Sequence, residues 1–589
     1  MKIIFNKKFI SFKSLNFIFI IFASFISNAQ LITNDLDNEL NWEWIKSALG
    51  NATSESMAVD PSGNIYVLGD FSDNLIFDDL TLSCELFSDM YLVKYDEAGN
   101  VIWGKSFGGE WGDFGKSVTT DNQGNVYITG QFCSNEITFG SITLVNNYIT
   151  PYFDESRFDI FTVKLDSNGT VIWAKKGGGI YFDYVNEICI DNSGNVYIFG
   201  YFQSPIISFD TISLMNTGNW DIYLTKYDTN GNVVWARSAV GNGQENAWSV
   251  TTDNEGNIYI CGSYRSNIIY FDNFTLTNTS TEFDIYLVKY DKYGKVIRVK
   301  SASGEEWDEA KSVTVDEDNN VYMTGYFKSD TLFFDSDTLF LSNNDNINLD
   351  MYVIKMDSNC NIIWSRTTEG SAWMYPKSIC SYKSDLISII GTFTGTNFGY
   401  IENFGSSTIT PVNSYDIFVV NYDSSGNDIR SESIGGMNMD FAQDNCIDST
   451  GNIYITADFD SDSIVIDTIT LINYYNNKMF VAKGIIENST FSQEYKLNTL
   501  IELSNFPNPF NIETNILYTV PELNKVEICI FNIYGNKIKV LVNKIHKSGN
   551  YSLIWDATNT EGRKISPGIY ICKIQVGKSN ITKKIVVSR

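Results

Sequence analysis

Strand-length apolar segments recur along most of this chain and are separated by short polar turns. The clearest begins with the turn Asp60-Pro-Ser-Gly-Asn64 and continues as Ile65-Tyr-Val-Leu-Gly69, which is apolar on both strand faces. Six further copies of this strand end at Gly130, Gly200, Gly262, Gly325, Gly391 and Ala457. A strand that is apolar on both faces is typical of one that is buried between two layers. The repetition therefore predicts an array of similar β-sheet units.

A second unit begins at an aspartate and contains an alternating apolar strand with a lysine. It starts at Asp89, Asp159, Asp221, Asp284, Asp350 and Asp416, with a degenerate copy at Asn477. A turn and a further strand follow, centred on Trp103, Trp173, Trp235, Arg298, Trp364 and Arg430. The seventh copy lacks this last strand, but a similar segment around Trp44 precedes the first copy. We therefore expect the Trp44 strand to complete the last unit, so that a closed ring leaves no edge unpaired.

These units predict an all-β protein in which residues 30–484 form a seven-bladed β-propeller with four strands per blade. A Phe-Asp element such as Phe77-Asp78 predicts an additional short hairpin between the second and third strands. The Asp-x-x-Gly-Asn-x-Tyr-x-x-Gly and Asp-x-Tyr-x-x-Lys patterns resemble the bacterial SBBP β-propeller repeat over residues 42–484. This resemblance implies the fold more than it implies an activity.

The sequence changes after residue 484. Residues 485–498 are predicted to be a linker, and residues 499–589 show alternating strands with turns, which predicts a small β-sandwich of immunoglobulin type. One of these strands is expected in the segment from Gly549 to Asp556.

The same segment resembles the type A C-terminal sorting domain of the type IX secretion system. Its motif residues are Pro507, Asn508, Pro509, Phe510, Asn511 and Gly535, whereas Asp556 is not assigned a role in sorting. The resemblance implies passage across the outer membrane, removal of this domain, release or surface attachment, and a Bacteroidetes host. A carbohydrate-binding or purely structural sandwich is the alternative.

The N-terminus predicts export. Lys2, Lys7, Lys8 and Lys13 precede an apolar run, Phe17–Phe22, and small residues at Ser27-Asn28-Ala29 resemble a cleavage site. Residues 1–29 are therefore predicted to be a secretory signal peptide. No later segment is apolar enough for a transmembrane helix.

Charge separates the parts of the chain. The net charge is −28, to which the four N-terminal lysines contribute +4 and residues 497–589 contribute +6, so that the predicted propeller carries about −38. Nucleic acid is therefore not expected as a partner, since polyphosphate binding needs a basic face. The charge favours either solubility outside the cell or attraction of cationic ligands.

Few residues in the predicted propeller suggest catalysis. The single histidine, His546, lies in the C-terminal segment, so histidine-dependent mechanisms are not expected. A glycan-active enzyme that uses only carboxylates stays open. Calcium at the Asp-x-x-Gly-Asn turns also stays open, although one aspartate per turn is fewer than a calcium loop uses. We expect no cofactor.

Cysteines give no metal motif. Cys189, Cys380 and Cys446 share one repeat position and are expected to be small buried residues of the first strand. Cys529 and Cys572 are candidates for a disulfide across the sandwich.

The connections between blades combine acids with aromatic residues and are expected to surround the mouth of the central channel. The candidate ligand-binding residues are Trp111, Asp113, Asp183, Glu245, Trp248, Trp307, Asp308, Trp373 and Asp440, with Tyr181, Tyr375 and Phe441 beside them. Aromatic faces with acids suit sugars, peptides or cations. The alternative is packing between blades with solvated acids.

Three functions are consistent with these features. The first is a secreted or surface-bound protein that binds or adheres to an extracellular glycan or protein without catalysis. The second is an extracellular carboxylate-dependent enzyme that acts on glycans. The third is a structural scaffold of a surface layer.

Overall fold

The computed structural model describes residues 40–588, except 85–86, 147–156, 335–336, 341–347, 395–401, 413–414, 468, 474–477, 487–502, 507, 509, 521–523, 533–534, 548 and 577–578. All regular elements in these residues are β-strands. The described residues fall into two compact units, one within Asn38–Ile486 and one within Glu487–Arg589. The predicted signal peptide lies outside the described residues, as do residues 487–498 of the predicted linker. None of the described segments is a helix that could cross a membrane.

The larger unit contains seven antiparallel sheets that share one plan, in which four strands pair in the order of a meander. Sheet 1 is formed by β2 (Leu49–Val59), β3 (Ile65–Phe77), β5 (Asp89–Tyr95) and β6 (Val101–Phe107). Sheet 2 is formed by β7 (Asp113–Thr120), β8 (Val126–Phe132), β11 (Asp159–Leu165) and β12 (Val171–Gly178). Sheet 3 is formed by β13 (Asp183–Ile190), β14 (Val196–Phe202), β17 (Asp221–Tyr227) and β18 (Val233–Gly241).

The remaining sheets repeat the plan. Sheet 4 is formed by β19 (Glu245–Thr252), β20 (Ile258–Tyr264), β23 (Asp284–Tyr290) and β24 (Val296–Ser303). Sheet 5 is formed by β25 (Asp308–Val315), β26 (Val321–Phe327), β29 (Asp350–Met356) and β30 (Ile362–Thr367). Sheet 6 is formed by β32 (Trp373–Tyr382), β33 (Leu386–Thr394), β36 (Asp416–Asp423) and β37 (Asp428–Ile434). Sheet 7 is formed by β38 (Asp440–Ile447), β39 (Ile453–Phe459), β42 (Lys478–Ile486) and β1 (Leu40–Ser47).

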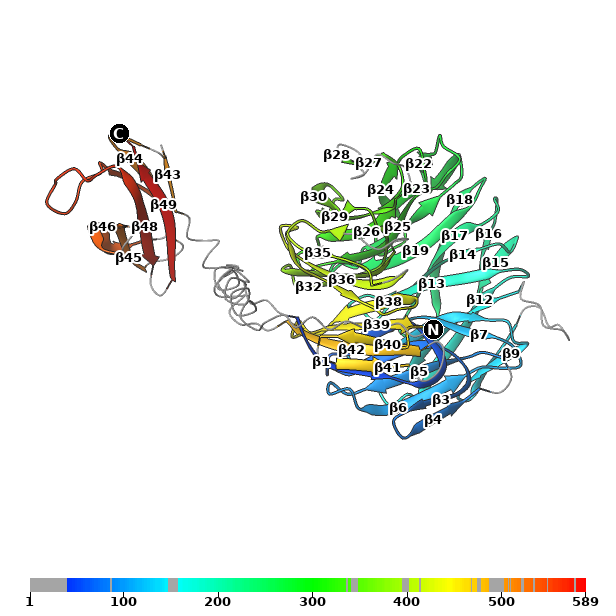
Figure 1. Cartoon of the computed structure of the whole chain (residues 1–589). Coiled ribbons are helices and arrows are strands. Elements are labelled where there is room, and N and C mark those ends of the chain that lie inside the picture. The colour runs from blue at the N-terminus through cyan, green and yellow to red at the C-terminus, as the bar shows by residue number, and fades with distance from the viewer. Residues whose placement is uncertain are drawn as a thin grey trace, which may run out of the picture. The chain divides into compact units, whose positions relative to one another are not determined.

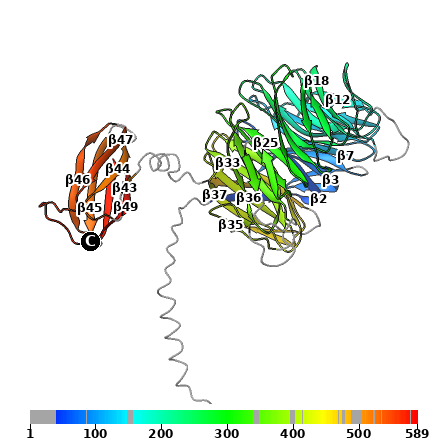
Figure 2. The same ribbon diagram turned by 90° about the horizontal axis from the view of Figure 1, so that it is seen from above.

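The N-terminal strand β1 belongs to the last sheet. It pairs with β42, with Trp44 opposite Lys483, and Figure 1 shows the blue first strand beside the yellow strands of sheet 7. We call the first strand of each sheet its inner strand. Each inner strand lies beside those of both neighbouring sheets, and β38 lies beside β2, which closes the ring. Figure 2 shows β2 and β3 of sheet 1 beside β7 of sheet 2.

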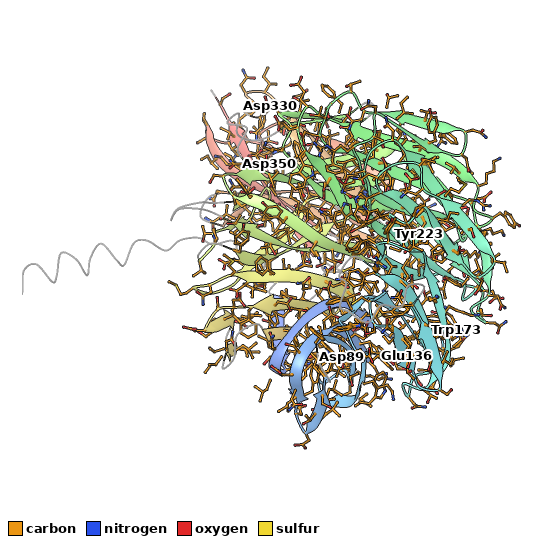
Figure 3. The ribbon with its side chains drawn as sticks, turned by 90° about the vertical axis from the view of Figure 1, so that its right-hand side faces the viewer. Asp89, Glu136, Trp173, Tyr223, Asp330 and Asp350 are labelled. Carbon is orange, nitrogen blue, oxygen red and sulfur yellow. The ribbon has the colours of Figure 1, made fainter. Side chains whose placement is uncertain are left out.

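Packing between sheets explains why the second strand of each sheet is apolar on both faces. Ile65, Tyr66, Val67 and Leu68 of β3 are all fully buried. Leu68 packs with Ile128 of the next sheet, whereas Val67 packs with Val481 of sheet 7. Figure 3 shows the side chains that fill these spaces, with Trp173 and Tyr223 labelled.

A short hairpin follows the second strand of six repeats, as the Phe-Asp element predicts. The hairpins are β9 (Glu136–Phe139) with β10 (Ile142–Val145), β15 (Ile206–Phe209) with β16 (Ile212–Met215), β21 (Ile268–Phe271) with β22 (Phe274–Thr277), β27 (Thr331–Phe334) with β28 (Asp337–Phe340), β34 (Glu402–Asn403) with β35 (Thr408–Ile409), and β40 (Ser463–Ile466) with β41 (Ile469–Ile472). In the first repeat, β4 (Leu80–Ser83) pairs with the long β3 instead, and β31 (Glu369–Gly370) pairs with β34. Three hairpins extend the preceding sheet, because β15, β21 and β27 pair with β12, β18 and β24. They cover outer edges that would otherwise be unpaired.

The smaller unit consists of two sheets around one core. One sheet contains β43 (Leu503–Phe506), β44 (Thr514–Val520) and β47 (Gly549–Trp555), and the other contains β46 (Lys537–His546), β45 (Asn524–Asn532), β48 (Gly568–Val576) and β49 (Ser579–Val587). Ile516 and Trp555 from the first sheet pack with Ile528 and Cys572 from the second.

The sorting motif is anchored to the last strand. The Asn508 amide donates to the Lys584 carbonyl at 2.9 Å and accepts from the Val586 N–H at 2.8 Å, and buried Phe510 packs on Trp555. Gly535 adopts a φ of 80° in a tight turn. Asn511 is exposed, and Pro507 and Pro509 lie outside the described residues.

Asp556 follows β47 directly and stabilises the turn after it. Its carboxylate accepts from the Thr558 hydroxyl at 2.6 Å and lies 3.4 Å from the Lys539 ammonium. These local contacts give it a structural role in the smaller unit.

The candidate disulfide of the smaller unit is not formed. Cys529 and Cys572 are both free and lie on adjacent strands of one sheet, where Cys572 pairs with Ile530 and Cys529 pairs with Lys573. Because successive side chains point to opposite faces of a sheet, the two thiols point to opposite faces.

Candidate functional site

The repeat signature builds a buried polar cluster at one end of six of the seven inner strands; sheet 6, whose turn after β32 lacks the signature, shows no such cluster in the described residues. In sheet 2, the Asp121 carboxylate accepts from the N–H groups of Gln123 and Asn125, from the Asn125 amide and from the Tyr127 hydroxyl, at 2.7–3.0 Å. Lys164 lies 3.8 Å from the same carboxylate and 4.9 Å from the centre of the Tyr127 ring. Burial acts to raise the pKa of Asp121, but these hydrogen bonds lower it overall. The signature residues therefore stabilise the turn, and protein donors already surround both carboxylate oxygens.

The inner strands change register at equivalent places near their other end. In each of the seven, the pairing skips one residue, which is a β-bulge. These bulge residues are Glu55, Lys116, Asn186, Trp248, Lys311, Lys377 and Gln443. All seven line one central cavity of about 690 Å³. A cavity of this size is within the range of small-ligand sites, roughly 300–1,000 Å³.

The residues that directly follow the bulges form hydrogen bonds between neighbouring inner strands. We call this set of hydrogen bonds the serine ring. The residue after each bulge is Ser56, Ser117, Glu187, Ser249, Ser312, Ser378 or Asp444. The Ser249 hydroxyl accepts from the Val313 N–H at 3.0 Å, and the Glu187 carboxylate accepts from the Val250 N–H. Asp444 closes the ring by accepting from the Met57 N–H at 2.9 Å.

The two acids in this hydrogen-bonded ring, Glu187 and Asp444, line the cavity, but both already accept hydrogen bonds from neighbouring inner strands. Asp444 also accepts from the Ser56 and Ser378 hydroxyls at 3.0 and 2.7 Å. Burial raises the pKa of Asp444 and raises that of Glu187 to about 8. Both groups therefore favour the protonated form more than an exposed acid does.

Two of the three lysines on the cavity wall form ion pairs, Lys116 with a second wall residue and Lys311 with an acid outside the wall. The Lys116 ammonium lies 3.0 Å from the Glu55 carboxylate. Lys311 is paired with Glu309 and lies 3.4 Å from the centre of the Trp248 ring. Burial lowers the pKa of Lys311, although Glu309 opposes this. Lys377 is exposed and has no ion pair within the described part of the chain.

One side of the cavity is aromatic. We call Trp248, Tyr326, Tyr375, Tyr415 and Phe441, which come from sheets 4 to 7, the aromatic wall. The ring centres of Tyr326 and Tyr375 are 5.6 Å apart and those of Tyr415 and Phe441 are 5.5 Å apart. Polar side chains of sheets 1 to 3 line the other side, where Tyr184 stacks on Tyr201 at 5.1 Å.

The acids predicted to bind a ligand lie elsewhere. Asp113, Asp183, Glu245, Asp308 and Asp440 are fully buried, and none lines the cavity. Each instead accepts a hydrogen bond from a serine hydroxyl that follows the second strand of its sheet. These serines are Ser134, Ser204, Ser266, Ser329 and Ser461.

Burial determines the ionisation of these acids. It raises the pKa of Asp113 and Asp308 to about 7 and that of Glu245 to about 8. The pKa values of Asp183 and Asp440 are also raised by burial. These acids therefore fit the alternative expectation, in which the connections between blades serve packing instead of ligand binding. They differ from it in being buried, whereas that expectation leaves the acids exposed to solvent.

The predicted aromatic residues divide into two groups. Trp248, Tyr375 and Phe441 line the cavity, whereas Trp111, Tyr181, Trp307 and Trp373 do not. The Trp307 indole donates to Glu309 at 2.9 Å, and Trp111 packs on Phe87 with ring centres 5.2 Å apart.

Sequence reasoning missed the other bulge residues. Their signal is variation within the repeat: the position after the bulge is serine in five sheets, whereas the bulge position holds Glu, Lys, Asn, Trp or Gln. In an internal repeat, a position that varies while its neighbours stay constant is free of the common structural role.

The three aligned cysteines are less buried than expected. Cys189, Cys380 and Cys446 are half-buried, free thiols, and none of them lines the cavity. In the described ranges, no group of three or more His, Cys, Asp or Glu side chains could hold a metal ion.

Comparisons with protein families match two parts of the chain. The model of a secretion system C-terminal sorting domain matches residues 504–588. The model of a β-propeller repeat of the SBBP type matches residues 102–131, which span β6, β7 and most of β8.

Two curated proteins are similar to parts of the chain. An uncharacterized WD repeat-containing protein, L264, of Acanthamoeba polyphaga mimivirus is 24% identical over 352 residues, which cover 50% of this chain and 25% of that protein. The regulatory protein FlaEY of Caulobacter vibrioides is 27% identical over 145 residues, or 25% of this chain and 14% of that protein. The chain therefore spans a quarter or less of these relatives.

Solved structures give distant likenesses. PorZ, a surface component of the type IX secretion system of Porphyromonas gingivalis, is 10% identical with a TM-score of 0.22, covering 91% of this chain and 82% of PorZ. A DUF4221 member from Bacteroides vulgatus is 12% identical with a TM-score of 0.30, covering 60% of this chain and 92% of that one. Both TM-scores are below 0.5, so the description of the fold rests on the strand pairing above.

The sorting domain implies export through interaction with the type IX secretion machinery, and an extracellular or cell-surface location. This chain carries a β-propeller repeat of the SBBP type and a C-terminal sorting domain of the type IX secretion system.

Proposed function

We propose that this protein is a secreted or surface-bound binding protein that captures an extracellular ligand in its central cavity without chemically changing it. The observation that carries the proposal is that the variable bulge residues of all seven inner strands converge on one cavity. A common frame with varied residues at one place is the arrangement that recognition needs. The sorting domain supports delivery to the outside of the cell.

The architecture that we propose is a seven-bladed β-propeller followed by an immunoglobulin-type sandwich. Seven four-stranded sheets and the β1–β42 pairing support the propeller. The three- and four-stranded sheets around one core support the sandwich. The signal peptide at residues 1–29 and a Bacteroidetes host are part of the same proposal.

Binding without catalysis is favoured because the acids of the cavity have other partners. Glu187 and Asp444 accept backbone N–H groups that join neighbouring sheets, and Glu55 is paired with Lys116. A glycan-active enzyme needs a general acid and a second free carboxylate flanking the bond that breaks. We also propose that binding requires no cofactor.

A binding screen tests this proposal. The purified protein is applied to arrays of glycans and extracellular proteins, with and without a chelator, and bound ligands are recovered for mass analysis. We expect a ligand that binds equally with chelator and is recovered intact. Cleaved ligand would favour the enzyme, and ordered self-association without any ligand would favour the surface-layer scaffold.

A further inference from the structure

We infer that the ligand of the central cavity is a neutral glycan, with its sugar rings on the aromatic wall and its hydroxyl groups bonded to polar groups of the cavity wall. This inference rests on the proposed function and specifies the ligand class.

The aromatic wall provides surfaces that suit sugar rings. Tyr375 and Tyr415 are half-buried and Phe441 is 37% exposed, so their rings are packed from behind and partly open. A pyranose has apolar C–H faces and a polar rim of hydroxyl groups, and the negative face of an aromatic ring attracts C–H groups. Rings fixed by neighbours also lose little conformational entropy on binding.

The rest of the cavity provides hydrogen-bonding groups that remain available. The bulge residue Asn186 lines the cavity, and so does Gln131. The bulge residue Gln443 lines it too, but its amide already donates to Asp458 at 2.7 Å. The Gln131 carbonyl oxygen and the Trp248 N–H are buried and have no hydrogen-bond partner among the residues that the structure describes. Unpaired buried polar atoms are costly, and a ligand hydroxyl that bonds to either would recover that cost.

Charge argues against an anionic polymer. Lys116 and Lys311 are neutralised by Glu55 and Glu309, which leaves Lys377 as the only bulge lysine without an ion pair in the described residues. The charge of about −38 on the predicted propeller would also repel a polyanion.

The inner strands argue against an extended peptide. A peptide that adds to a sheet needs a free strand edge. Here the inner strands already use edge N–H groups, such as those of Val313 and Met57, to bond to neighbouring sheets.

Calorimetry on the full-length protein tests the inference. The probes are cello-, manno-, xylo- and chito-oligosaccharides of about three to six units, oligogalacturonate as the anionic counterpart, and a mixture of short peptides. We expect at least one neutral oligosaccharide to bind, with an affinity that changes less than about twofold between roughly 0.05 and 0.5 M salt. Tyr375→Ala and Tyr415→Ala should each weaken that binding by about tenfold or more.

Control variants separate the ligand class from a loss of folding. Tyr375→Phe keeps the ring and should retain most of the affinity. Tyr293→Ala removes an exposed tyrosine outside the cavity and should change nothing. Each variant is checked for an unchanged unfolding midpoint.

The outcomes distinguish the two proposals. Salt-sensitive binding of oligogalacturonate that requires Lys377, or binding of peptides alone, would overturn the neutral glycan but keep the cavity as a binding site. An oligosaccharide affinity that is unchanged in the Tyr375→Ala and Tyr415→Ala variants would overturn both the glycan inference and the proposed site. The absence of binding to every probe would do the same.

Discussion

A tryptophan on the outer strand of one sheet lies against a glycine in the next sheet, and this pair recurs around the ring. Trp44, Trp103, Trp173, Trp235 and Trp364 contact Gly99, Gly169, Gly231, Gly294 and Gly426. Each glycine has a φ near 80°, and a Cβ there would lie about 3 Å from the indole. Two sheets lack the tryptophan, and in both the glycine is missing as well. Arg298 replaces tryptophan in sheet 4, where Cys360 of the next sheet replaces glycine. Arg430 replaces it in sheet 6, because the outer strand of sheet 7 is β1 and no turn with a glycine precedes it.

This contact predicts the effect of one substitution. Gly231→Ala places a Cβ 2.8 Å from the Trp173 ring in addition to its unfavourable φ. We expect a loss of about 2–4 kcal/mol in the free energy of unfolding, measured by urea denaturation. Gly256→Ala is the control, because its φ is also 80° but its nearest neighbour is 3.7 Å away, and it should cost only about 1 kcal/mol. Equal losses would show that the indole contact is unimportant.

At the scale of the element, the inner strand combines two tasks. Its regular part carries the serine ring that holds neighbouring sheets together, whereas its bulge turns one variable side chain towards the cavity. The structural task uses the same residue type in most sheets, so that, in the function we propose, ligand specificity could change at the bulge without loss of the frame.

The serine ring can be tested at one bond. Ser249→Ala removes the acceptor for the buried Val313 N–H and should reduce the free energy of unfolding by about 1–3 kcal/mol. Ser213→Ala, in an exposed hairpin, should change it by less than about 0.5 kcal/mol. A Ser249→Ala protein as stable as the wild type would contradict this role of the ring.

The pairing of β1 with the last sheet can also be tested. The Trp44 indole donates to the Glu97 carbonyl at 3.1 Å and packs near Tyr454. Trp44→Ala should cost about 3–5 kcal/mol and accelerate hydrogen exchange in β42. Trp173→Ala should cost a similar amount but leave exchange in β42 unchanged, and equal acceleration by both variants would argue against a local closure.

Much of this frame can be predicted from the sequence, because it depends on alternation and repetition. The apolar faces of Ile65–Leu68 indicate a strand between layers, and the place of Trp44 before the first repeat indicates its pairing with the last. The candidate site is harder to predict, because one skipped residue changes which side chains face the channel. The sequence pattern therefore predicts acids such as Asp113 at the channel mouth, although they lie buried against serines, and it does not single out Lys116.

At the scale of the whole molecule, buried acids make stability depend on pH. Burial raises the pKa of Asp113, Asp284, Asp308 and Asp458 to about 7 and that of Glu187, Glu245 and Glu402 to about 8. In the unfolded chain these groups ionise near pH 4. The folded protein therefore binds more protons between about pH 4 and 8, and its stability should fall as pH rises through this window.

Urea midpoints at pH 5.5 and pH 8 test this dependence. We expect the lower midpoint at pH 8, and a smaller difference in Asp308→Asn, which keeps an oxygen to accept from Ser329 but cannot ionise. A midpoint that does not fall between these pH values would contradict the raised pKa values of these acids in the folded protein.

We propose that the ring of sheets presents one recognition cavity. A crystal structure of the protein soaked with the neutral oligosaccharide that binds best tests it most directly. We predict density for sugar rings against Tyr375 and Tyr415, with hydroxyl groups near Gln131 and Asn186. Density for the sugar on the outer hairpins or on the C-terminal unit, with the central cavity empty, would contradict the claim.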